Sequence, residues 1–162
     1  MQQYYLIRPA VYGDLGSDAV IDHSARPPLL QKVHIEINVL SSDDLHAVHL
    51  CYMVSERLGR RLEGSKLTGA KIEEAQIELS EQAREYYPHV SSLGVLRLKV
   101  HGQLKIDDFR LDEHDRLIVS QAAMDVLREF RLEEGKVYDG NNPPSQEQIT
   151  KDVWDDARRC VE

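Results

Sequence analysis

Residues 32–39, Lys-Val-His-Ile-Glu-Ile-Asn-Val, alternate polar and apolar side chains without a break. Successive side chains of a strand point to opposite faces of its sheet. The valines and isoleucines would therefore share one face, and the polar residues between them would share the other. The pattern predicts a half-buried strand. We expect its polar face, including His34, to be open to solvent.

Further strand candidates lie on both sides of this stretch. The longest covers residues 95–106, where apolar residues hold the even positions from Leu96 to Ile106, and Gly102 fits a bulge within it. Residues 9–31 contain Gly13, Gly16 and a Pro-Pro pair, which predict a loop or extended chain. The remaining strand candidates are residues 4–7, the run 50–54, residues 71–79, residues 116–119 and a last edge strand at 136–138.

Helices are expected where an N-capping residue precedes apolar residues at helical spacing. Ser55 precedes Leu58 and Leu62, and Gly64 can end that helix. Ser120 caps the strongest helix pattern, which runs to residue 130. A short helix at 80–87 is stopped by a proline. Strand segments lie too close together for regular βαβ units, so the pattern predicts an α+β fold with a mixed or mostly antiparallel sheet and a few short helices packed on it.

The composition changes at residues 139–144, Asp-Gly-Asn-Asn-Pro-Pro, which favour turns. We therefore predict one α+β domain over residues 1–138, a turn-rich linker at 139–144 and a C-terminal helix over 145–162. Residues 145–148, Ser-Gln-Glu-Gln, have the form of a capping box. The helix carries Trp154 beside an apolar stripe of Ile149, Val153, Ala157 and Val161. We expect it to dock on the domain rather than on a partner, because monomers rarely expose large apolar patches.

The composition limits the classes of function. The chain has 162 residues, 20 basic and 28 acidic, so its net charge is 20 − 28 = −8, and its pI is about 5.4. This balance disfavours nucleic-acid binding and adsorption to anionic membranes, which need clustered Lys and Arg. The sequence shows no membrane-length apolar run and no secretory signal. Two cysteines, Cys51 and Cys160, are too few for a disulfide scaffold, so we expect a cytoplasmic protein with reduced thiols.

The best metal-ligand candidate is the spacing His46-x-x-His49-x-Cys51. Zinc accepts imidazole and thiolate ligands. The spacing matches no common zinc pattern, however, and no second Cys/His pair completes four ligands. We expect His46 in a turn, with His49 and Cys51 on one face of the strand that follows. We favour unligated histidines and a buried free cysteine, since free cysteine commonly behaves as a small hydrophobe.

Other chemical motifs are weak or missing. Asp22-His23 is similar to the dyad of metal-dependent phosphohydrolases, but it lies in a Pro-rich segment without further ligands, and a solvated loop pair is the favoured interpretation. The sequence contains no nucleophile elbow, no Walker-type loop and no Gly-x-Gly-x-x-Gly. We therefore assign no catalytic, cofactor-binding or metal-binding residue and do not expect an enzyme.

Acidic residues cluster in one short stretch. This cluster can be a solvated connection or an electrostatic docking patch for a basic partner, since such patches speed association and select partners. A second acidic candidate lies before the strand that begins near residue 50. The predicted partner-binding residues are Asp107, Asp108, Asp112, Glu113 and Asp115, together with Asp43 and Asp44.

Several phrases in order resemble a known family. They are Tyr-Tyr-Leu-Ile-Arg-Pro at 4–9, Val-Ser-Glu-Arg-Leu at 54–58, Leu-Lys-Val at 98–100 leading to Ile-Asp-Asp-Phe at 106–109, and Leu-Ile-Val-Ser at 117–120 before Leu-Arg-Glu-Phe at 127–130. Together they resemble a family of bacterial immunity proteins from polymorphic toxin systems, first catalogued as a domain of unknown function. The resemblance covers about residues 4–138 and leaves out the tail after residue 144.

The resemblance implies a non-enzymatic inhibitor in the producer's cytosol. Such proteins bind a cognate toxin domain, often one delivered by a contact-dependent or type VI secretion route, and cover or lock its active site. The matched motifs transfer no catalytic residues, and no oligomeric state is implied. Two rival hypotheses remain: a small metal-dependent hydrolase built around His46 and His49, and an adaptor or chaperone for a secreted effector.

Overall fold

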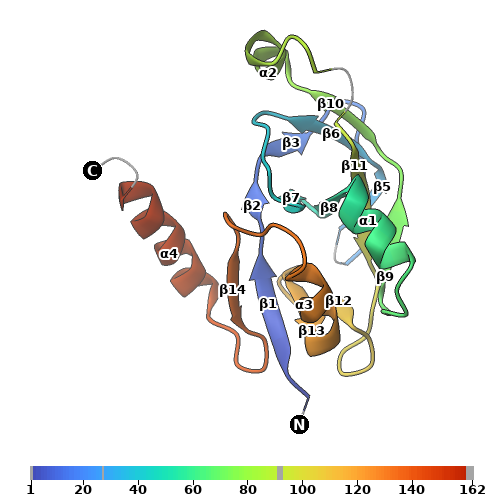
Figure 1. Cartoon of the computed structure of the whole chain (residues 1–162), viewed down its shortest axis with the longest axis vertical. Helices are drawn as coiled ribbons and strands as arrows, with labels where there is room; N and C mark the ends of the chain where they lie inside the picture. Colours follow the sequence, from blue (N-terminus) through green and yellow to red (C-terminus); the bar gives the residue numbers. More distant parts are fainter. Residues whose placement is uncertain (1, 27, 91–92, 160–162) are drawn as a thin grey trace.

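The computed structural model describes residues 2–26, 28–90 and 93–159, and its strands and short helices form an α+β fold (Figure 1). The predicted fold class is confirmed. Within these residues most strand pairs are antiparallel, and only β10–β6 and β2–β7 are parallel. No helix among them is long and apolar enough to cross a membrane.

The terminal sheet contains the first and last strands of the chain. Its strand order is β12 (Phe109–Leu111), β13 (Leu117–Ser120), β1 (Tyr4–Arg8) and β14 (Lys136–Asp139). The strand predicted at 4–7 is therefore the centre of this sheet, and the strand predicted at 136–138 is an edge, as expected.

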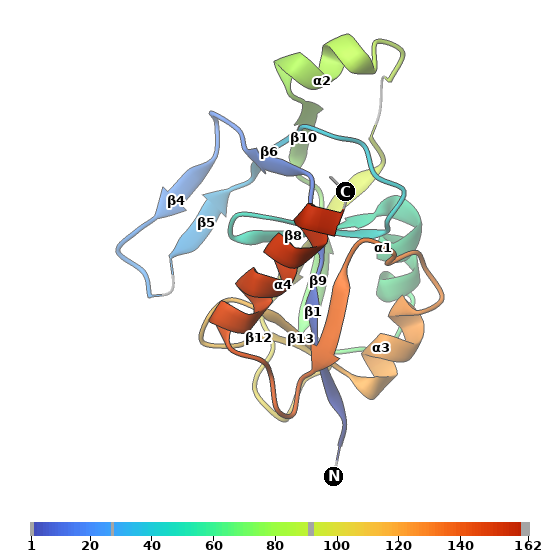
Figure 2. The ribbon, with the colours of Figure 1, turned by 90° about the vertical axis from the view of Figure 1, so that its left-hand side faces the viewer.

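Two further sheets and a hairpin complete the β structure. The central sheet has the order β2 (Ala10–Val11), β7 (Leu45–Val48), β8 (Cys51–Ser55), β11 (Val95–Val100) and β9 (Ala70–Glu73). The side sheet has the order β10 (Gln76–Leu79), β6 (His34–Ile37) and β3 (Gly13–Leu15). A separate hairpin of β4 (Val20–Asp22) and β5 (Leu29–Lys32) projects from the molecule (Figure 2).

Serine side chains begin the helices. Ser55, Ser80 and Ser120 each accept the backbone N–H three residues further on, which satisfies a donor that the first turn leaves free. The caps predicted at Ser55 and Ser120 are confirmed. The helices are α1 (Glu56–Glu63), α2 (Glu81–Tyr86), α3 (Gln121–Leu127) and α4 (Gln146–Arg159).

The apolar faces meet in distinct clusters. The largest lies between the central and terminal sheets and includes Leu58 and Leu62 of α1 with Phe109. A second lies between the central and side sheets and includes Ile35 and Met53, both fully buried. The alternation at residues 33–37 therefore buries its apolar face as predicted.

The C-terminal helix docks on the domain. Ile149 is buried in a third cluster with Tyr4, Leu6 and Ile118, on the face of the terminal sheet opposite α3 (Figure 2). This confirms docking at Ile149, while Trp154 is 62% exposed. The side chains of Val153 and Ala157, and residues 160–162 with Cys160 and Val161, lie outside what the structure describes.

The strand predicted at 95–106 is too long, because β11 ends at Val100. The N–H groups of His101 and Gly102 both donate to the Gly69 carbonyl, and the chain then turns away. Gly102 is needed for close packing, since a Cβ there would lie 1.9 Å from the Phe109 carbonyl oxygen. The prediction failed because alternation cannot detect a close approach by another segment.

Other predicted boundaries also differ. Residues 71–79 are not one strand: the chain leaves the central sheet after Glu73 and enters the side sheet at Gln76. The segment 9–31, predicted as loop, contains β2, β3, β4 and part of β5. These strands are two to four residues long, too short for periodicity to reveal.

Candidate functional site

The polar face of the side sheet carries a row of carboxylates. Glu36 on β6 lies directly opposite Glu78 of β10 on one side and Asp14 of β3 on the other. Asp18 joins them, because its carboxylate accepts a hydrogen bond of 3.1 Å from Gln76 on β10. We call Asp14, Asp18, Glu36 and Glu78 the acidic face. The opposite face of the same strands packs into the second apolar cluster.

Glu36 is the unpaired centre of this row. Asp14 accepts a hydrogen bond from Asn38, and Glu78 accepts one from Arg84, at 3.1 Å each. The side chain of Glu36 makes no hydrogen bond or ion pair with any residue the structure describes. Like charges directly opposite each other destabilise a sheet by roughly 0.2–1 kcal/mol per pair. The arrangement therefore costs folding stability and offers acceptors to a cationic group from outside.

His34 is buried beneath this face, at 2% exposure, and the prediction that it faces solvent is wrong. The turn after β3 covers its ring so closely that a Cβ at Gly16 would lie 2.3 Å from it. Its Nδ1 accepts the Asp18 N–H at 3.0 Å, so Nε2 carries the proton and donates to Glu78 at 2.6 Å. His34 thus positions the Glu78 carboxylate.

The same part of the side sheet contains a possible group of metal ligands. Possible ligand atoms of His34, Glu36 and Glu78 lie within 4.8 Å of one another, the one such group of three among the described residues. A cation would have to bind the lone pair of the histidine Nε2. Because Nδ1 accepts a hydrogen bond, the proton of the neutral ring lies on Nε2, so that nitrogen has no free lone pair. The arrangement therefore suits hydrogen-bond donors such as lysine or arginine better than a metal ion.

The second predicted acidic site, Asp43 and Asp44, accepts hydrogen bonds from other residues of the same chain. Asp44 accepts two hydrogen bonds from Arg57, at 2.8 and 2.6 Å, one from Ser55 at 2.5 Å and one from the Arg131 N–H at 2.8 Å. Asp43 accepts the N–H groups of residues 133 and 134, at 3.0 and 2.9 Å. Both are buried, at 2% and 4% exposure. They hold the loop after α3 against the start of α1.

The predicted cluster at 107–115 is mostly engaged in the same way. Asp107 accepts the Gln103 N–H, and Asp108 binds Ser120 and Thr68. Asp112 accepts from Arg116 at 2.7 Å and has a side chain only 6% exposed. Glu113 is 79% exposed and Asp115 is half-buried, and neither carboxylate accepts a hydrogen bond from a described residue. Partner contact by the seven predicted residues stays a prediction. Glu113 and Asp115 are the least engaged of them, although the Glu113 carboxylate lies 3.9 Å from His114 Nε2.

Two of these carboxylates make stability depend on pH. Burial raises the pKa of Asp44, but hydrogen bonds from Arg57, Ser55 and the Arg131 amide outweigh it and lower the pKa to about 2. Burial likewise raises the pKa of Asp112, and hydrogen bonds from Arg116 and the His114 amide lower it overall. Because both folded-state values lie below the unfolded value of 3.8, their contribution is present above that pH and lost below it.

We expect the stability difference between wild type and Asp44→Asn to shrink as the pH falls from about 5 to about 2. The reason is that protonated Asp44 resembles asparagine in shape and charge. The expected loss from Asp44 is about 2 kcal/mol over this range. Urea unfolding at several pH values measures it. A difference that stays constant down to about pH 2 would contradict the assignment.

The proposed metal spacing does not converge. His46 lies on β7 rather than in a turn, buried and 5.3 Å from the Tyr12 ring, while His49 is exposed in the turn after β7. Burial lowers the pKa of His46 despite the nearby Asp43 and Asp44. Cys51 packs in the second apolar cluster, where burial raises the pKa of its thiol to about 11. A buried thiol of this kind is unreactive.

Asp22 is the last residue of β4 and is half-buried, and His23 lies exposed in the turn that follows. The Asp22 carboxylate accepts hydrogen bonds from the backbone and hydroxyl of Ser24, at 2.9 and 2.5 Å, and these lower its pKa. Neither residue belongs to a group of metal ligands among the described residues. The favoured interpretation, a loop pair, describes His23 but not Asp22, which ends a strand.

No protein-family model matches this chain, and no curated protein matches its sequence. The acidic face was missed because its members come from residues 14, 18, 36 and 78, which belong to three strands and a loop. Glu36 and Glu78 gave a signal, as polar positions in the strands predicted at 32–39 and 71–79. Nothing in the sequence indicates that these two strands lie side by side.

Proposed function

We propose that this chain is an immunity protein that neutralises a cognate bacterial toxin domain by binding it in the cytoplasm. The resemblance of about residues 4–138 suggests the family. The observation that carries the binding mode is the acidic face, where Glu36 lies between two other carboxylates and its side chain has no cationic partner among the described residues. A structure that keeps such a costly arrangement on a partly exposed sheet face favours a role for it in recognition.

The residues that carry the resemblance lie outside the acidic face. They lie in β1, in β8 and the start of α1, in β11 and β12, and in β13 and α3, so they build the terminal and central sheets. The acidic face belongs to the side sheet. This division supports a shared scaffold that presents a partner-specific surface.

The expected mechanism needs no bond making. The carboxylates of the acidic face accept charge-assisted hydrogen bonds from lysine or arginine side chains of the toxin. A basic surface is common on toxins that cut nucleic acid, and opposite potentials speed their association. Binding there would cover the toxin's own phosphate-binding surface, which accounts for inhibition without catalysis.

The test is co-expression with the C-terminal domain of the protein that the neighbouring gene encodes. We expect growth rescue and a complex that survives gel filtration at physiological salt. Glu36→Lys should weaken the complex about tenfold or more and reduce its salt dependence, because it reverses the central charge. Glu85→Lys is the matched control, since Glu85 is exposed on α2 and outside the acidic face. A complex without rescue would instead support the adaptor hypothesis, and equal effects of the two variants would reject this surface.

Glu36 also allows a stability test that needs no partner. Glu36→Gln keeps the shape and removes two opposed pairs of like charge, so we expect the free energy of unfolding to rise by about 0.5 kcal/mol. Glu85→Gln removes no charge of the acidic face, so it should change the free energy of unfolding little. Urea unfolding of both variants gives the comparison. A destabilised Glu36→Gln would show that Glu36 has a stabilising role inside this chain.

A further inference from the structure

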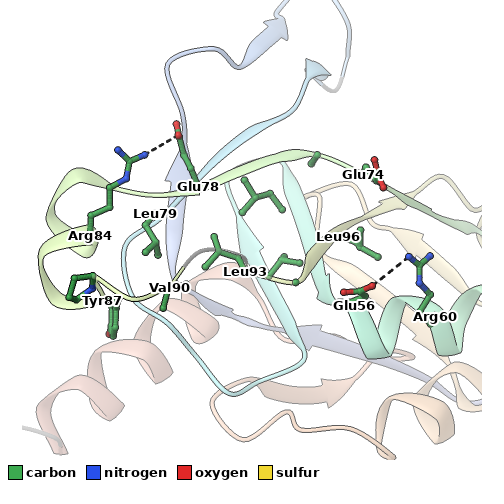
Figure 3. Close-up of a pocket in the computed structure, with 15 residues that line it drawn as sticks. Glu56, Arg60, Glu74, Glu78, Leu79, Arg84, Tyr87, Val90, Leu93 and Leu96 are labelled. Atoms are coloured by element: carbon green, nitrogen blue, oxygen red, sulfur yellow. Dashed lines mark hydrogen bonds and ion pairs between the residues drawn. The ribbon is translucent and has the colours of Figure 1, made fainter.

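A groove of about 770 Å³ runs along β10, beside the acidic face (Figure 3). Its apolar lining comes from Ile77 and Leu79 on one wall and from Leu93 and Leu96 on the other. Polar side chains lie around it. Glu78 belongs both to the groove and to the acidic face, so the two surfaces are continuous.

The backbone of β10 is unpaired on one side. Within the described residues β10 pairs only with β6 and is the edge of its sheet. The N–H groups of Gln76 and Ser80 donate toward β6, to the carbonyls of Val33 and Ile37. Backbone groups of a strand alternate in direction, so those of Ile77 and Leu79 point to the open edge. An open edge of this kind is a template for another extended segment.

Most charged side chains around the groove are paired with one another, but one carboxylate is not. Arg60 lies 3.6 Å from Glu56, and Arg84 lies 3.1 Å from Glu78, so these four side chains pair with one another. Glu74 is exposed and has no ion pair with any residue in the described ranges. The groove therefore offers one free carboxylate to a basic residue.

We propose that this groove binds an extended segment of the toxin as an added strand on β10. This inference rests on the proposed function and specifies how the partner is held. The segment hydrogen-bonds to the backbone of Ile77 and Leu79 and places alternate apolar side chains against Ile77 and Leu93. A basic side chain at its end pairs with Glu74. Main-chain bonds supply affinity in such strand addition, and the side-chain pockets supply specificity.

A synthetic peptide tests the groove without the toxin. The probe is a capped heptapeptide that alternates valine with lysine and threonine, added to the full chain labelled with ¹⁵N. We expect slower hydrogen exchange at the Ile77 and Leu79 amides, while the Gln76 amide, already bonded to β6, changes little. Unchanged exchange at Ile77 and Leu79 with millimolar peptide would overturn the proposal.

Charge variants give the second measurement. Glu74→Lys should weaken peptide binding about tenfold, while Glu85→Lys, an equal change of net charge outside the groove, should leave it nearly unchanged. Equal weakening by both would show non-specific attraction and overturn the proposal. A toxin complex with unchanged Kd in Glu74→Lys would overturn the groove and leave the proposed function intact. A peptide that binds while the toxin domain does not would reject the proposed function and support the groove.

Discussion

Gly102→Ala is expected to lower the free energy of unfolding by at least about 3 kcal/mol. The new Cβ would lie 1.9 Å from the Phe109 carbonyl oxygen and 2.9 Å from the Gly69 Cα, and both of these are backbone atoms that no rotamer change can move. The segments would have to separate. That separation would break the hydrogen bonds from His101 and Gly102 to the Gly69 carbonyl, and the one from Phe109 to Thr68.

Urea unfolding, followed by circular dichroism, measures this loss, and the corresponding drop in Tm is roughly 6–12 °C. Gly64→Ala is the matched control. Gly64 has φ −80°, and the atom nearest to a Cβ there is 3.6 Å away, so alanine fits. We expect that control to change stability by less than about 0.5 kcal/mol. Equal stabilities of the two variants would mean that residues 101–109 do not pack as described.

Asp44→Ala is expected to cost about 3 kcal/mol, the other large effect. The side chain is 3% exposed and joins three segments through Ser55, Arg57 and the Arg131 N–H. Its removal leaves the Arg131 N–H and the Ser55 hydroxyl without their acceptor. The N-cap of α1 is loosened as well, because Ser55 provides it.

Arg57→Ala measures how much the Asp44–Arg57 ion pair contributes to stability, apart from the other hydrogen bonds of Asp44. The Arg57 side chain is 66% exposed, so solvent screens its attraction to Asp44 and we expect a loss of no more than about 1 kcal/mol. Thermal unfolding of the two variants decides between the contributions. Equal losses would show that the ion pair, rather than the buried network, stabilises this junction. The same measurement distinguishes a structural Asp44 from the partner-binding Asp44 that the sequence predicts, since a pure contact residue would leave Tm unchanged.

Local signals in the sequence predicted much of the fold. The alternation at 32–39 predicted that Ile35 and Ile37 are buried, and serines before apolar residues predicted the starts of α1 and α3. The turn-rich break before residue 145 predicted the separate C-terminal helix. Each of these features depends on residues within a few positions of one another, so the sequence contains the whole signal.

The acidic residues show the limit of such signals. A run of aspartates looks the same whether it is solvated or hydrogen-bonded. Asp44 and Asp108 became internal acceptors because distant donors, the Arg131 N–H and the Thr68 N–H, fold back onto them. Only the exposed Glu113 and the half-buried Asp115 keep carboxylates free of internal hydrogen bonds among the described residues.

The sequence by itself determined where α1 and α3 begin and which face of residues 33–37 is apolar, because these properties follow from spacing along the chain. Tertiary structure alone decided the register of β3, β6 and β10, which aligns Asp14, Glu36 and Glu78. It also decided that His34 is covered by Gly16 and that β11 ends where Gly102 meets Phe109. The physical reason is that these contacts join residues up to 42 positions apart, as with Glu36 and Glu78. Such contacts form only when the apolar faces of separate strands pack together.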